Sequence, residues 1–119
     1  MKISEFIALL NTTKETVRHY EDLNLVTPKR VKSRREYGQK EVLDFQVILE
    51  LKGMGLSLKD IQLLFDLKRA IGCGEQGLVR EVILHLTNHL EMLRNEEDLL
   101  RERRMKLEKQ LEEVKLLLV

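Results

Sequence analysis

The chain has 119 residues and a formal net charge of +1, which is the size of one compact domain with no strong overall charge. Hydrophobic residues make up 43% and charged residues 34%, but aromatic residues only 4%, which favours long solvent-exposed helices over a bulky globule. The chain shows no apolar run of membrane-spanning length, no signal-peptide pattern and only one cysteine, Cys73, which argues against a membrane protein or a disulfide-stabilised secreted domain and for a cytoplasmic protein.

Two short helices are predicted at the start of the chain. Apolar residues at helical spacing behind Ser4, a suitable N-cap, predict a helix over residues 4–10. Thr12 and Glu15 have the spacing of a capping box and precede a second helix over about residues 14–23. Two such helices separated by about three residues are typical of a helix-turn-helix, although any helical hairpin shows the same pattern.

A polar, interrupted stretch follows from Val26 to Tyr37, after Asn24, which suits a left-handed helix end. It predicts an extended loop or a small two-stranded wing. Five of the seven residues from Lys29 to Arg35 are cations, and residues 1–37 carry eight Lys and Arg against five Asp and Glu. This basic excess suits a polyanionic partner, and a solvated basic loop is the alternative.

Two further helices complete the N-terminal part. The apolar pattern predicts a helix over residues 40–53, followed by a turn. Ser57 and Asp60 then give the N-terminal signal of a fourth helix. The glycine-rich segment 71–77 interrupts the helical pattern and predicts a linker. The four helices and the wing therefore form a predicted head domain over residues 1–70.

Residues 78–119 contain neither Gly nor Pro and predict one long helix of about 60 Å with a heptad repeat. So long an apolar seam cannot be buried against so small a head domain, which predicts a coiled coil with a second copy of the chain. A helix folded back on its own head domain is the alternative. The predicted dimer interface follows alternating steps of four and three: Leu86, Leu90, Leu93, Glu97, Leu100, Arg104, Leu107, Leu111, Val114 and Leu118.

The two charged residues of this seam indicate its orientation. In an antiparallel pair, residues whose numbers sum to 204 face each other, and Glu97 and Arg104 lie near the twofold axis, where salt bridges across the two chains can form. A parallel pair would place Glu97 against Glu97 and Arg104 against Arg104, which like-charge repulsion disfavours. We therefore predict an antiparallel homodimer.

Five segments of the chain, in order and at matching distances, then point to a known family: Met1–Glu5, Thr16–Glu21, Leu25–Pro28, Arg34–Tyr37 and Lys52–Ile61. In these segments the chain resembles the MerR family of bacterial transcription regulators. It departs from the family at His19-Tyr20, where two adjacent aromatics are usual, and at Arg34, where Tyr is common.

The resemblance implies a mostly α fold with a winged helix-turn-helix head and an antiparallel coiled coil. It implies a homodimer that binds double-stranded promoter DNA at an inverted repeat and distorts it, and so acts on RNA polymerase indirectly through the DNA. Such a regulator would be associated with the nucleoid in the bacterial cytoplasm.

The predicted DNA contacts fall into two groups. With the second helix in the major groove, Lys14, Glu15 and Thr16 are placed to read bases. Arg18, Tyr20, Arg35 and Tyr37 are assigned to phosphates. For each tyrosine the alternative is a core aromatic whose hydroxyl is satisfied locally. The full predicted set is Lys14, Glu15, Thr16, Arg18, His19, Tyr20, Lys32, Arg34, Arg35 and Tyr37.

No metal site, cofactor or enzyme activity is predicted. Cys73 has no second cysteine to complete a soft-metal site, which favours a passive thiol over a sensor. His85 and His89 lie four residues apart, which allows two-point metal binding but is more typical of the solvated flanks of a coiled coil. The sequence shows no nucleophile–base pair and no phosphate-binding glycine loop. The competing function is a coiled-coil adaptor whose helical head binds protein.

Overall fold

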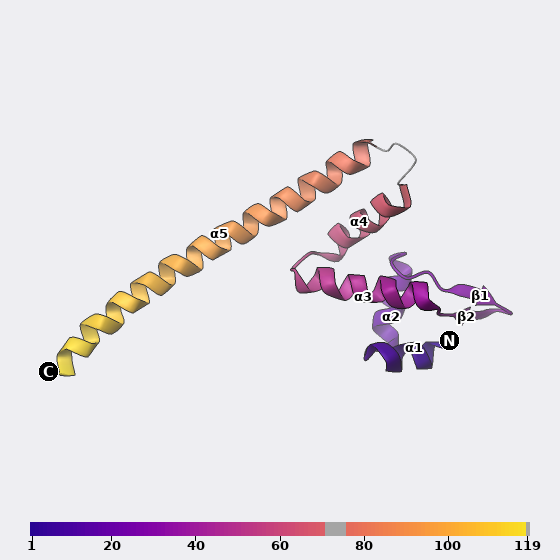
Figure 1. Cartoon of the computed structure of the whole chain (residues 1–119), viewed down its shortest axis with the longest axis horizontal. Coiled ribbons are helices and arrows are strands. Elements are labelled where there is room, and N and C mark those ends of the chain that lie inside the picture. The colour runs from indigo at the N-terminus through magenta and orange to yellow at the C-terminus, as the bar shows by residue number, and fades with distance from the viewer. Residues whose placement is uncertain (71–75, 119) are drawn as a thin grey trace. The chain divides into compact units, whose positions relative to one another are not determined.

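The computed structural model of the chain describes residues 1–70 and 76–118. The chain divides into two units, Met1–Val82 and Ile83–Val119. The predicted fold class is confirmed: the chain is mostly helical, with a small two-stranded antiparallel wing and a long C-terminal helix. The elements are α1 (Ile3–Leu10), α2 (Lys14–Asp22), β1 (Lys29–Val31), β2 (Arg34–Glu36), α3 (Gln39–Gly53), α4 (Leu58–Ala70) and α5 (Gln76–Lys115), followed by a 3₁₀ turn at Leu116–Leu118 (Figure 1).

The first unit is built around an aromatic core. Helix α1 contacts α2 and α3, and α3 contacts α4. The ring of Phe6 stacks on the ring of Tyr37 at 4.5 Å between centroids and meets Phe45 edge-on at 5.9 Å. Tyr20 packs against Phe45 at 5.5 Å. The other buried members of the core are Val17, Leu25, Val26, Val42, Ile48 and Ile61.

The starts of the first two helices differ from the prediction. The N-cap of α1 is Lys2, because Ser4 already lies inside the helix. The N-cap of α2 is Thr13, whose Oγ1 accepts a hydrogen bond from the backbone N–H of Thr16 at 3.2 Å. Thr12, the predicted cap, instead uses its backbone N–H to close the turn after α1. Each cap is therefore shifted from its predicted position, although both helices form where predicted.

The predicted wing is confirmed as an antiparallel hairpin in which Arg30 pairs with Arg35 and Val31 with Arg34. Lys32 and Ser33 both have positive φ, at 50° and 65°, which suits the right-handed twist of a two-residue hairpin turn. Asn24 also has positive φ, 59°, at the end of α2, as predicted.

The end of the first unit also follows the prediction in part. Ser57 Oγ accepts a hydrogen bond from the backbone N–H of Asp60 at 3.1 Å at the start of α4. Helix α5 begins at Gln76, two residues before its predicted start, because Gly77 is accommodated in the first turn of the helix. Cys73 and the rest of segment 71–75 lie outside the described residues.

Within the described ranges, no helix has both the length and the apolar character needed to cross a membrane.

Candidate nucleic-acid interface

Helix α2 exposes one charged face. Val17 and Tyr20 are buried in the core, which turns the remaining side chains outward. Lys14, Glu15 and His19 are exposed and Thr16 is half-buried. The Thr16 hydroxyl lies 2.9 Å from the hydroxyl of Thr13, so it is already engaged in the cap of the helix. The polar face predicted to read bases is thus present on the surface of α2.

Both tyrosines of the predicted site lie in the core. Tyr37 is completely buried and Tyr20 is 3% exposed. The Tyr20 hydroxyl accepts a hydrogen bond from Lys52 Nζ at 3.4 Å, and the Tyr37 hydroxyl donates one to Glu21 Oε1 at 3.0 Å. Both hydroxyls thus have local partners. In this arrangement Tyr37 presents no surface to DNA and Tyr20 presents very little.

A carboxylate that sequence reasoning did not assign joins α2 to the wing. Arg35 Nε lies 3.2 Å from Glu21 Oε1, and Arg18 Nε lies 3.7 Å from Glu21 Oε2. Glu21 is only 10% exposed at its side chain, whereas the two arginines are about one third exposed. The spacing of Arg18 and Glu21 along α2 is a sequence signal for the first pair. No local pattern signals the second.

The surface of the wing is cationic. A hollow of about 420 Å³ is lined by four cations, one carboxylate and one apolar residue: Lys2, Val31, Lys32, Arg34, Arg35 and Glu36. Lys2 was not predicted as part of the site. It lies there because the Met1 carbonyl accepts a hydrogen bond from the backbone N–H of Tyr37 at 2.8 Å, directly after β2. The excess of positive charge at this surface favours an anionic partner.

The Tyr37–Glu21 contact makes stability depend on pH. Burial, the hydrogen bond to Glu21 and the negative charge of Glu21 together raise the pKa of Tyr37 from 10.0 to about 12, against a smaller lowering effect of the nearby Arg18 and Arg35. Because the pKa is higher in the folded chain, the stabilisation is complete below pH 10 and is lost as the pH rises toward 12. We expect the free energy of unfolding to fall more steeply over this interval in the natural chain than in Tyr37→Phe.

Urea unfolding followed by circular dichroism, at one protein concentration, measures this difference. At neutral pH the Tyr37→Phe variant is expected to be less stable by about 1 kcal/mol, the contribution of the lost hydrogen bond. That deficit should shrink as the pH passes 10. Parallel curves for the two proteins across the alkaline interval would contradict the assignment of the raised pKa to Tyr37.

The ten residues of the predicted dimer interface are all exposed in the single chain. Val79 and Ile83 are exposed as well and continue the same heptad positions toward the start of α5. Arg104 forms an ion pair with Glu108 of its own helix at 2.6 Å. An apolar seam therefore runs uncovered along α5.

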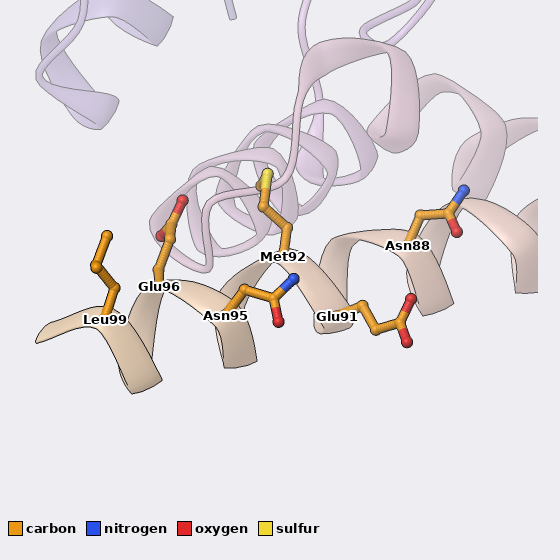
Figure 2. A pocket seen from close by; sticks show the side chains of 6 residues that line it. All are labelled: Asn88, Glu91, Met92, Asn95, Glu96 and Leu99. Atoms are coloured by element: carbon orange, nitrogen blue, oxygen red, sulfur yellow. The ribbon is translucent and has the colours of Figure 1, made fainter. Parts of the chain in front are cut away.

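One hollow lies along helix α5. A hollow of about 390 Å³ is lined by side chains of this one helix only, as Figure 2 shows: Asn88, Glu91, Met92, Asn95, Glu96 and Leu99. A hollow with a single helix as its wall is an open groove. Across residues 1–70 and 76–118, no three His, Cys, Asp or Glu side chains come close enough together to hold a metal ion.

One comparison identifies a family for the first part of the chain. Residues 1–68 match the family model described as MerR HTH family regulatory protein. The match covers more than half of the chain and includes α1, α2, the wing, α3 and most of α4. No curated protein matches the chain.

Proposed function

The chain belongs to the MerR HTH family of DNA-binding transcription regulators, and we propose that it acts as a homodimer on an inverted repeat in promoter DNA. The observation that carries this proposal is the pairing of an exposed polar face on α2 with the cationic surface of the wing. A helix of this kind fits the major groove, and cations beside it contact the phosphates of the same duplex.

Within this proposal, the residues divide by what they touch. Lys14, Glu15 and Thr16 of α2 read base edges in the major groove. Five further side chains contact phosphates and set the position of the protein without reading sequence: Arg18, His19, Lys32, Arg34 and Arg35. Tyr20 and Tyr37 lie in the core and support the interface from within, Tyr37 through its hydrogen bond to Glu21.

The dimer follows from the uncovered seam of α5. We propose that residues 1–70 bind DNA and that residues 78–119 pair with a second copy in antiparallel orientation. Two heads related by a twofold axis match two half-sites of an inverted repeat. We further propose that binding distorts the promoter, so that RNA polymerase senses the protein through the DNA. The site of action is then the nucleoid, in the cytoplasm of a bacterium.

The Arg35→Ala substitution tests the role of the wing. We expect it to weaken the binding of all duplexes to a similar degree and to flatten the salt dependence by about two units per dimer, one for each half-site. By contrast, Lys14→Ala is expected to change which sequence is preferred, by roughly 1–3 kcal/mol for a lost base contact. Fluorescence anisotropy of labelled duplexes over a series of salt concentrations measures both effects.

The matched control is Lys109→Ala, which removes the same charge from an exposed position on α5 that has no predicted DNA contact. Its affinity and salt dependence should equal those of the natural chain. If Arg35→Ala also left both unchanged, the wing would not contact phosphate. If the natural chain showed no salt-dependent affinity for any duplex, the competing function as a protein-binding adaptor would be favoured.

A further inference from the structure

Glu21 is the one carboxylate of the described residues that contacts both α2 and the wing. It lies near the end of α2 and receives Arg18 from its own helix, Arg35 from β2 and the hydroxyl of Tyr37. Its side chain is 10% exposed, so the carboxylate has left most of its hydration and its contacts with these three side chains compensate for that loss. A nearly buried acid beside Arg18 and Arg35 weakens the attraction of these two arginines for DNA. A role in orienting the two arginines would account for the presence of this acid.

The atoms involved favour such a role. Both arginines approach Glu21 through Nε, at 3.7 Å for Arg18 and 3.2 Å for Arg35. An arginine has five N–H donors in one plane, and so it can bind a carboxylate on one edge and a phosphate on another. The side chains of Arg18 and Arg35 are 37% and 33% exposed, so part of each remains accessible to DNA.

The contact with Arg18 is electrostatic and not a directional hydrogen bond. At 3.7 Å, Arg18 Nε and Glu21 Oε2 are both buried, and neither has a hydrogen-bond partner among the described residues. The single negative charge therefore lies between two positive charges that would otherwise repel each other. Loss of the charge would free both arginines to adopt separate orientations, with an entropic cost when DNA fixes them again.

We propose that Glu21 is a positioning residue of the DNA interface, which holds Arg18 of α2 and Arg35 of the wing in one arrangement. The inference rests on the proposed function. In this arrangement, the helix and the wing meet the DNA backbone in a single register, which places the base-reading residues of α2. The acid thus lowers the affinity for DNA in general and raises the preference for one sequence.

The experiment compares Glu21→Gln with Asp22→Asn. Asp22 is the adjacent acid, is exposed and forms no ion pair with any described residue, so the two variants lose the same charge, but only Glu21→Gln loses the buried contacts with Arg18, Arg35 and Tyr37. The probes are the duplex that the natural chain enriches most from a random pool and a scrambled duplex of equal composition. The measured quantity is the ratio of the two affinities.

We expect Asp22→Asn to bind both duplexes slightly more tightly, with an unchanged ratio. We expect Glu21→Gln to bind the scrambled duplex at least as tightly as the natural chain and the enriched duplex about tenfold more weakly, so that the ratio falls about tenfold or more. Glu21→Asp, which restores the charge on a shorter side chain, should recover part of the ratio.

A second variant avoids the removal of a buried carboxylate. Arg35→Lys keeps the net charge but replaces the rigid planar group by a compact ammonium on a flexible stem, which does not fix the geometry between Glu21 and a phosphate. The ratio should fall in this variant too. Melting temperatures of all variants, measured by circular dichroism, separate positioning from folding.

Two results would overturn the inference. One is an equal ratio in Glu21→Gln, Asp22→Asn and the natural chain. The other is a parallel loss of both affinities together with a lower melting temperature, which would make Glu21 a purely structural residue. Absence of binding to either duplex by the natural chain is a different result, because it would refute the proposed function itself and the inference with it.

Discussion

Replacement of both Leu93 and Leu100 by lysine is expected to convert a dimer, with twice the 14.0 kDa mass of the chain, into a monomer. Both leucines are exposed in the single chain and occupy d positions of the predicted seam. In the antiparallel register, position 100 faces Arg104 of the second copy, so Leu100→Lys also introduces a like-charge contact. Analytical ultracentrifugation at micromolar concentration measures the change in mass.

The size of the effect follows from the apolar surface. Burial of one leucine side chain stabilises a complex by about 1.5–3 kcal/mol, and the dimer contains two copies of each position. The loss of four buried leucines is thus about 6–12 kcal/mol, more than ten-thousandfold in the dissociation constant. Binding to an inverted repeat should fall by about 100-fold or more, because each monomer then binds its half-site without the second.

A matched control lies one residue away from each position. Met92 and Leu99 are exposed apolar residues at c positions and line the groove drawn in Figure 2. Met92→Lys with Leu99→Lys adds the same two charges outside the predicted seam and should leave the dimer intact. Dissociation of this control to the same extent would show that the heptad register is wrong. A natural chain that is monomeric, with its helix content retained, would refute the dimer altogether.

The helices and the wing could be predicted from the sequence, but the contacts between them could not. Helical spacing of apolar residues and the polar, cation-rich stretch before Tyr37 predicted α1 to α4 and the wing, because these signals are local. The exact caps were less predictable. Thr12 and Thr13 are chemically equivalent candidates, and Thr13 is the cap because Thr12 belongs to the turn that closes α1, where its N–H donates to the Ile7 carbonyl.

The parts of the site that escaped prediction depend on tertiary contacts. Glu21 meets Arg35 and Tyr37, which lie 14 and 16 residues further along the chain, and no local pattern reports such a meeting. Lys2 reaches the wing only because Met1 pairs with the backbone of Tyr37. The same contacts explain why Tyr37, assigned to a phosphate by resemblance, has a buried ring: it stacks on Phe6 of α1 while its hydroxyl donates to Glu21.

The orientation of the coiled coil can be tested by a covalent cross-link between residues 90 and 114. In a Cys73→Ser background, one preparation carries Leu90→Cys and a second carries Val114→Cys. The two positions sum to 204, so an antiparallel pair places them in the same layer of the seam. We expect the disulfide to form on mild oxidation only when the two preparations are mixed by unfolding and refolding, and not in either preparation alone.

Electrophoresis without reductant shows which dimer is covalent. A parallel pair would place residue 90 against residue 90 of the second copy, so Leu90→Cys alone would cross-link and the mixture would add nothing.

The charged residues of the seam are the reason to expect a cross-link only in the mixture. In a parallel pair Glu97 meets Glu97 and Arg104 meets Arg104 within the seam, whereas in the antiparallel register the two residues lie about one helical turn apart across the twofold axis. Arg104 already pairs with Glu108 at 2.6 Å on its own helix, and in the antiparallel dimer Glu97 of the second copy can join that ion pair as a second acid. A parallel dimer gives two repulsive layers and no such network. A cross-link between residues 90 and 114 therefore shows the orientation that the charges of the seam favour.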